Sequence, residues 1–109
     1  MSRTPEDVLT EIRGIRIELS KAPGALYEAE LKAERAEDAA QMTLDKALLL
    51  AEGSVPEKQA HARLASSEDR DVAFIARAEL NRVKTKTRGL ESALMSLQSE
   101  LKWMRDEGA

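Results

Sequence analysis

The sequence predicts an all-α protein: a long antiparallel helical hairpin of the coiled-coil type, with its first arm kinked at Pro23. Three observations support this prediction. Small or apolar residues repeat at alternating steps of three and four along the last third of the chain, which is the period of a coiled-coil seam. A similar repeat runs through the first half, and a strong turn signal separates the two. Aromatic residues make up only 3% of the chain and charged residues 34%, which is typical of long helices rather than of a thick globular core.

The repeat in the last third of the chain is the most regular pattern in the sequence. Its members are Ala73, Ala76, Leu80, Val83, Thr87, Leu90, Leu94, Leu97, Leu101 and Met104. We call these ten residues the C-terminal seam. Because a helix buries such a stripe only against another helix, the first half of the chain must supply the partner.

A first helix is predicted over residues 5–21. Thr4 is a good N-cap, and Pro5 suits the first helical position because it needs no backbone hydrogen-bond donor there. Apolar residues then recur at steps of four, three and four, and they predict the stripe that faces the partner helix. They are Val8, Ile12, Ile15 and Leu19.

A second helix is predicted over residues 25–51, after a kink or tight break at Pro23. Proline removes a backbone donor and clashes with the preceding turn of a helix. The three-four repeat resumes directly afterwards, mostly with alanine, so the partner helix can approach closely. Its members are Leu26, Ala29, Ala33, Ala36, Ala40, Thr43, Ala47 and Leu50.

The chain is predicted to reverse at Gly53 and to continue as a long helix over residues 55–106. Gly53 suits a left-handed backbone conformation, and Ser54 with Glu57 three residues later forms a capping box. Extending the C-terminal seam backwards places Ser66 and Asp69 on it. This indicates either a polar layer in a continuous helix, which we favour, or a break at 66–67 that would permit a more compact bundle.

The lengths of the two arms agree with each other, which predicts a single hairpin domain over residues 1–109. If the chain reverses at Gly53, residues whose numbers sum to about 107 face each other. Large apolar residues near the N-terminus then oppose the leucines of 90–101, and the alanine-rich helix opposes the small residues near Ala73 and Ala76.

A hairpin alone leaves many apolar side chains uncovered, and soluble monomers rarely expose large apolar patches. We therefore expect self-association, most simply into a dimer that forms a four-helix bundle. The alternative is that the same surface binds a different protein. The predicted oligomer or partner face comprises Leu31, Met42, Leu44, Leu48, Leu49, Phe74, Ile75, Met95 and Trp103.

Composition argues against several other functions. No cysteine is present and the five glycines are isolated, so neither thiolate chemistry nor a phosphate-binding loop is indicated. The single histidine, His61, lies four residues after Glu57, which predicts a surface contact rather than a metal or catalytic site. We expect no enzymatic activity, no metal and no cofactor. The sequence has neither an apolar signal-peptide core nor a long apolar run, so we expect a cytoplasmic protein without membrane association.

A basic tract in the C-terminal half predicts a second possible function, direct binding of nucleic acid. It comprises Arg77, Arg82, Lys84, Lys86 and Arg88. Against this function, the net charge is −3, and the helical period places Arg82 and Lys86 on a different side from Lys84 and Arg88. The alternative is that these bases pair with acidic residues of the opposite arm, Glu18 among them.

Two segments resemble small, uncharacterised helical proteins of tailed bacteriophages, encoded among early recombination and replication genes. These segments are Ala51-Glu52-Gly53-Ser54-Val55-Pro56-Glu57-Lys58-Gln59-Ala60 and Leu97-Gln98-Ser99-Glu100-Leu101-Lys102. The resemblance implies an accessory protein of phage DNA metabolism that acts in the host cytoplasm, and it implies no catalytic residue. Together with the apolar faces, it predicts a helical adaptor that works through protein contacts. A scaffolding coiled coil is a third possibility.

Overall fold

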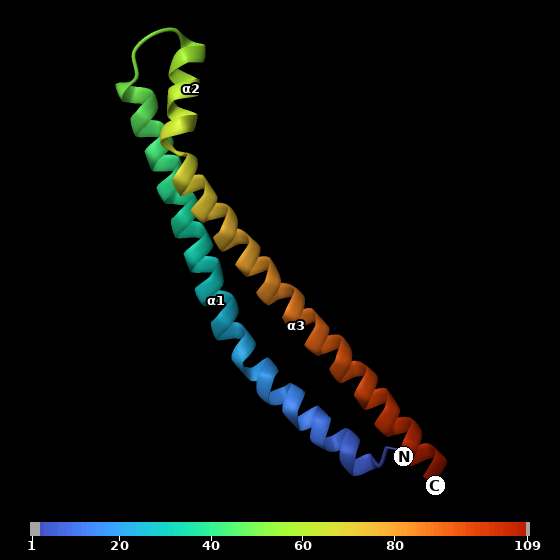
Figure 1. Cartoon of the computed structure of the whole chain (residues 1–109). Coiled ribbons are helices and arrows are strands. Elements are labelled where there is room, and N and C mark those ends of the chain that lie inside the picture. Colours follow the sequence, from blue (N-terminus) through green and yellow to red (C-terminus); the bar gives the residue numbers. More distant parts are fainter. Residues whose placement is uncertain (1–2, 109) are drawn as a thin grey trace. The chain divides into compact units, whose positions relative to one another are not determined.

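A computed structural model describes residues 3–108, and within this range the chain forms three helices and no strand (Figure 1). Helix α1 spans Pro5–Leu50, α2 spans Val55–Ala65 and α3 spans Ser67–Gly108. The contacts between them are those of a helical hairpin. Residues 1, 2 and 109 of the predicted domain lie outside the described part.

Contacts group the chain into two units, where the sequence predicts a single domain. The terminal unit comprises Met1–Leu26 and Arg82–Ala109, and the central unit comprises Tyr27–Asn81. The boundary falls where the seam of α1 changes from branched aliphatic residues to alanine. Each unit therefore has its own kind of packing, and each is described below by itself.

The N-terminus of α1 is capped as its sequence predicts. The Thr4 hydroxyl oxygen accepts a hydrogen bond from the Asp7 backbone N–H at 3.2 Å, and the Asp7 carboxylate accepts one from the Thr4 backbone N–H at 3.0 Å. The bond from the Thr4 backbone N–H to the carboxylate is the main cause of a lowered Asp7 pKa, and the Thr4 hydroxyl beside the carboxylate lowers it further, because both groups stabilise the ionised form. The reciprocal arrangement is a capping box with aspartate at its third position.

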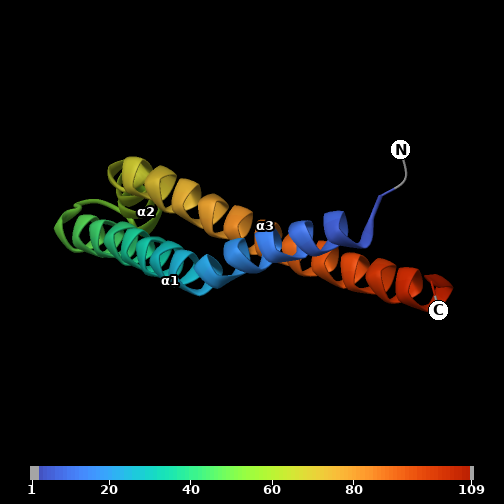
Figure 2. The same cartoon turned by 90° about the horizontal axis from the view of Figure 1, so that it is seen from below.

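Helix α1 continues through Pro23 without ending, as the unbroken α1 ribbon of Figure 2 shows. The predicted division into helices over 5–21 and 25–51 is therefore wrong: the two are one helix. Proline removes only its own backbone donor, so the Leu19 carbonyl loses its usual partner while the flanking hydrogen bonds can form. Packing of the seam on both sides of Pro23 offsets that loss, since Ala22 and Leu26 are both half-buried.

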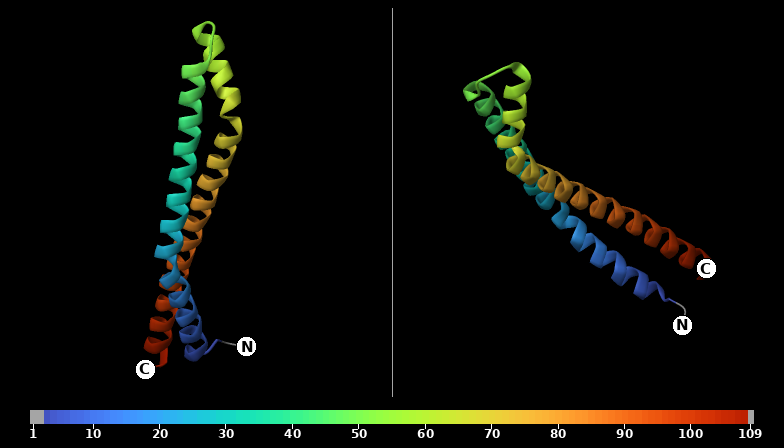
Figure 3. Two further views of the ribbon diagram at one scale, coloured as in Figure 1. Left: turned by 90° about the vertical axis from the view of Figure 1, so that its left-hand side faces the viewer. Right: turned by 45° about the horizontal axis from the view of Figure 1, so that its top comes forward.

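The chain reverses between α1 and α2, and both views of Figure 3 show α2 beside the last turns of α1. Gly53 is the one described residue with a positive φ, 111°, a region that L side chains rarely adopt. Ser54 caps α2, because its hydroxyl accepts a hydrogen bond from the Glu57 N–H at 3.4 Å. The turn predicted at Gly53 is thus confirmed, with Pro56 in the first turn of α2.

A single residue, Ser66, separates α2 from α3, so the continuous helix that the sequence favours is interrupted. Its φ and ψ are −96° and 2°, outside the helical region. Hydrogen bonding still crosses the interruption, from the Ser66 N–H to the Ala62 carbonyl and from the Arg70 N–H to the Ser66 carbonyl. The predicted polar layer is present as well, since Ser66 is fully buried and Thr43 donates a hydrogen bond to Asp69.

In the terminal unit, aliphatic side chains fill the space between α1 and α3. Val8, Ile12 and Leu97 are buried together. Ile15, Leu94, Leu101 and Met104 pack against them, while Leu19, Val83 and Leu90 are half-buried further along. Residues 8 and 12 therefore contact the leucines of 94–101, as an antiparallel pair of helices requires.

In the central unit, small side chains fill most of the space between the helices, and Leu80 is the one large buried side chain among the described residues of this unit. Its buried residues are Ala33, Ala40, Ala62, Ser66, Ala73, Ala76 and Leu80. Polar side chains cross between the helices at its margins. The Arg77 Nε donates a hydrogen bond to the Glu37 carboxylate at 2.8 Å, and the Lys32 Nζ donates one to the Glu79 carboxylate at 3.1 Å.

The observed register differs from the predicted sum of about 107. In the central unit, the pairs Glu37 with Arg77 and Lys32 with Glu79 give sums of 114 and 111. In the terminal unit, Arg3 with Glu100 gives 103. A single offset from the turn therefore does not describe the pairing. The central pairs lie one to two helical turns beyond the expected register, on the far side of the interruption at Ser66.

Candidate interaction surfaces

Apolar side chains outside the seams form the principal candidate surface. Of the nine predicted residues, Met42, Leu49, Phe74, Ile75, Met95 and Trp103 are exposed, while Leu31, Leu44 and Leu48 are half-buried. The exposure is large: 84% for Leu49, 76% for Phe74 and 63% for Trp103. These side chains make little contact within the chain, so the hairpin itself does not explain their apolar character.

The nine residues of the predicted face are not all of the exposed apolar side chains. Leu50, Val55 and Leu64 lie on both sides of the turn, and Val72 lies on α3. Ile17 and Tyr27 are exposed on α1. The helical period does place Val72 beside the seam rather than on it, so its position was available in the sequence. The exposure of Leu50 could not be predicted from the sequence. Leu50 belongs to the seam, and it is uncovered because α1 ends at this residue.

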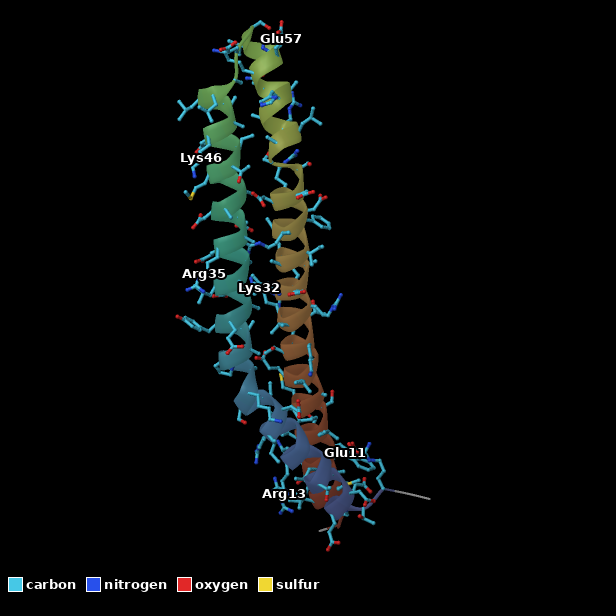
Figure 4. All side chains as sticks on the ribbon, turned by 60° about the vertical axis from the view of Figure 1, so that its left-hand side comes forward. Glu11, Arg13, Lys32, Arg35, Lys46 and Glu57 are labelled. Carbon is cyan, nitrogen blue, oxygen red and sulfur yellow. The ribbon has the colours of Figure 1, made fainter. Side chains whose placement is uncertain are left out.

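The predicted face of the central unit divides into two sides. Figure 4 shows Arg35 and Lys46 pointing away from α2 and α3, whereas Lys32 extends toward α3. Leu31, Met42 and Leu49 share the outward side by their spacing of 11 and 7 residues. Leu44 and Leu48 instead face α2 and line a hollow of about 370 Å³ with Gln59, Ala62 and Arg63.

The terminal unit has a smaller hollow, of about 210 Å³, between α1 and α3. Its apolar wall comes from Ala22, Ala25, Val83 and Leu90. Polar side chains, Glu18, Lys21, Lys86 and Thr87, complete it. It lies where the seam residues of α1 are small, so the gap follows from the alanines that flank Pro23.

The five predicted nucleic-acid contacts do not form one group. Arg77, in the central unit, is paired with Glu37. In the terminal unit, Arg82 and Arg88 are exposed, Lys84 is half-buried, and Lys86 lies 4.0 Å from Glu18. The predicted alternative, pairing with acids of the opposite arm, is therefore realised for Arg77 and Lys86.

The described residues offer no arrangement for metal chemistry. Residues 3–108 contain no cluster of three or more histidine, cysteine, aspartate or glutamate side chains that could hold a metal ion. His61 is exposed on α2. Across the same range, no helix is long and apolar enough to cross a bilayer.

No family model, curated protein or solved structure matches this chain. The exposed side chains and the charges around them are therefore the basis for assigning a function.

Proposed function

We propose that this protein is a non-enzymatic helical adaptor that acts by presenting apolar helix faces to other proteins, including copies of itself. The supporting observation is the exposure of Met42, Leu49, Phe74, Ile75 and Trp103 on helices whose inner sides are already paired. Exposed apolar surface of this extent marks protein interaction sites in soluble proteins. In this proposal the paired helices form a coiled coil, α1 is kinked at Pro23, and copies associate into a bundle, most simply a dimer.

The resemblance to small phage proteins supports a partner in DNA recombination or replication, and a site of action in the cytoplasm of the host. Both parts of this assignment stay predictions. They are tested by the proteins that co-purify with the tagged chain from phage-infected cells, compared with a variant in which Leu49 and Phe74 are changed to glutamine. Recovery of the same proteins with both chains would contradict an adaptor that uses these faces.

Self-association is tested directly by sedimentation equilibrium over a wide range of protein concentration. We expect a mass that rises from monomer to dimer. The double variant Phe74→Gln, Ile75→Gln should shift this transition to higher concentration, because it removes apolar area that only a partner can cover. Ala60→Gln, at an exposed position of α2, is the control and should leave the transition unchanged. A chain that stays monomeric throughout would overturn self-association, and large assemblies would favour a scaffold.

Direct nucleic-acid binding is a second candidate, supported by the exposure of Arg82 and Arg88. A mobility shift at low salt that disappears when Arg82, Lys84 and Arg88 become glutamine would support it, because phosphate contacts release counterions and weaken with salt. Absence of a shift at low salt would remove this candidate. The adaptor function is preferred, because the net charge of −3 opposes attraction to a polyanion.

A further inference from the structure

The side of α3 opposite its seam carries an ordered set of charged and apolar residues. It comprises Glu68, Asp71, Ile75, Ala78, Arg82 and Lys86, and all six are exposed. Their steps of three and four keep them on one side of a helix. Helix α3 is uninterrupted from Ser67 to Gly108, so its period alone sets this arrangement. We call these six residues the outer α3 face.

The chemistry of the outer α3 face changes along the helix. Two carboxylates come first, Ile75 and Ala78 follow, and two bases come last. Ile75 is 58% exposed, and its neighbour Phe74 is 76% exposed at the edge of the face. The side chains of Asp71 and Arg82 have no hydrogen bond or ion pair with another described residue. The face is therefore apolar at its centre and oppositely charged at its two ends.

We propose that the outer α3 face binds the same face of a second copy, antiparallel, about a two-fold axis between residues 76 and 77. This inference rests on the self-association proposed above and names its surface. In this arrangement Asp71 of each copy lies opposite Arg82 of the other, and Glu68 lies opposite Lys86. The apolar residues Ile75 and Ala78 of the two copies meet at the axis.

Charge complementarity selects this orientation. Residues whose numbers sum to 153 or 154 face each other, as Asp71 with Arg82 and Glu68 with Lys86 do. Glu68 and Lys86 also lie toward the same edge of the face, so reversal brings unlike charges together on that edge. A parallel pair would instead place Asp71 against Asp71 and Arg82 against Arg82, which is repulsive.

The outward side of α1 in the central unit does not have this property. Reversal about residue 40 would place Leu31 opposite Leu49, yet it would also bring Arg35 and Lys46 to the same height. Both of these bases point away from α2 and α3 (Figure 4). The helical period puts them on the same edge, so like charges would meet. The outer α3 face is therefore the better self-complementary surface.

Introduced cysteines test the geometry, because the natural chain has none. In the proposed dimer the two copies of Ala78→Cys are about 5 Å apart along the helix axis, a separation compatible with a disulfide. The two copies of Ser96→Cys, on the same side of α3, are about 58 Å apart along it. We expect oxidation to give a cross-linked dimer with Ala78→Cys and none with Ser96→Cys. Equal cross-linking of both would indicate a parallel pair and overturn the proposal.

Charge reversal provides the second test. Asp71→Arg and Arg82→Asp should each weaken homodimer formation by at least about tenfold, because each places like charges at both ends of the interface. An equimolar mixture of the two variants should form a heterodimer. In that heterodimer the introduced arginine meets the introduced aspartate at one end, and the natural pair is kept at the other. Circular dichroism of each variant establishes that the helices are retained. Failure of the mixture to associate would overturn the proposal.

The two tests separate this inference from the proposed function. A wild-type chain that sediments as a monomer overturns this inference and the proposed self-association, while the presentation of apolar faces to other proteins keeps its own test by co-purification. A wild-type dimer that neither cross-links through Ala78→Cys nor responds to Asp71→Arg overturns only the outer α3 face. In that case the interface lies on another apolar surface, and the adaptor function keeps its support.

Discussion

The terminal and central units pair their helices by different means. In the terminal unit, large aliphatic side chains such as Val8, Ile12 and Leu97 fill the space between the helices. In the central unit, the corresponding positions hold alanines, among them Ala33 and Ala76. Burial of an aliphatic side chain stabilises by about 1.5–3 kcal/mol and each methylene contributes about 0.8 kcal/mol, so an alanine seam gains much less per residue.

Polar contacts between the helices are shorter in the central unit, where apolar burial is smaller. The central unit has the Arg77–Glu37 pair, in which both Nε and a terminal guanidinium nitrogen donate to one carboxylate oxygen. It also has the buried layer of Ser66 with Thr43 and Asp69 nearby. The ion pairs between the helices of the terminal unit are longer, at 3.4 Å for Arg3–Glu100 and 4.0 Å for Lys86–Glu18. Small side chains let the helices approach, and the polar side chains then specify which residues meet.

The largest difference between the units should appear when a core side chain is shortened. Ile12→Ala should lower the free energy of unfolding by about 3 kcal/mol, since it removes buried methylenes and leaves a cavity. Urea denaturation followed by circular dichroism measures this loss. Ile17→Ala, on the exposed side of the same helix, should change stability by less than about 0.5 kcal/mol. Equal losses would mean that the aliphatic cluster does not stabilise the terminal unit.

Enlarging a side chain should have its effect in the central unit. Ala33 is completely buried, so Ala33→Leu should cost about 2 kcal/mol by forcing the helices apart. Ala39→Leu, at an exposed position on the same helix, is the matched control and should be nearly neutral. The same denaturation experiment compares the two. A stabilised Ala33→Leu variant would show that the central seam is not closely packed.

The ionic contact of the central unit should contribute less than its core. Arg77→Met retains the aliphatic stem and removes the charge, and it should cost at most about 1 kcal/mol because both partners are nearly half-exposed. A double-mutant cycle with Glu37→Gln isolates the interaction between the two side chains. Its coupling energy should decrease at high salt. A coupling that is insensitive to salt would contradict a screened, partly exposed pair.

The smallest expected effect is the dependence of the terminal unit on pH through Asp7. The folded pKa of Asp7 is lowered by its hydrogen bonds to Thr4, so its contribution is fully present above the ordinary pKa of aspartate. That contribution is lost as the pH falls through the lowered value. An NMR titration of the Asp7 carboxyl carbon in the wild type and in Thr4→Ala measures the shift. We expect the pKa of Asp7 to rise only partly in Thr4→Ala, because the backbone N–H at position 4 remains. A wild-type Asp7 pKa at or above the ordinary value of aspartate would contradict the role of the cap.

The sequence predicted the helical class and the inner side of each helix, because a strict three-four repeat is a strong signal. All ten residues of the C-terminal seam are buried or half-buried. The continuity of α1 could not be predicted in the same way. Proline at position 23 lowers helix stability locally, and only the packing of Ala22 and Leu26 against a distant segment decides whether the helix continues.

The pairing register of the helices and the interruption at Ser66 also could not be predicted from the sequence, for a different physical reason. The position of Ser66 on the seam was recognised, but a buried serine is compatible with either a polar layer or a break. The structure contains both. Among the exposed apolar residues, Phe74 and Ile75 were identified because they fall off the seam. Val72 also falls off the seam in the helical period and is 56% exposed, so the same reasoning could have identified it.

The single-residue interruption at Ser66 has a consequence for the cooperativity of folding. Helix α2 has only 11 residues, near or below the length at which an isolated helix persists in water, and Ala62 is its one buried residue. Few buried contacts therefore stabilise α2, even when α3 stays folded. Backbone amides of residues 55–65 should exchange with deuterium by local opening, well before those near Ala33 and Ala76. The tip of the hairpin would then be a separate, weakly stable folding unit that can open while the paired helices remain intact.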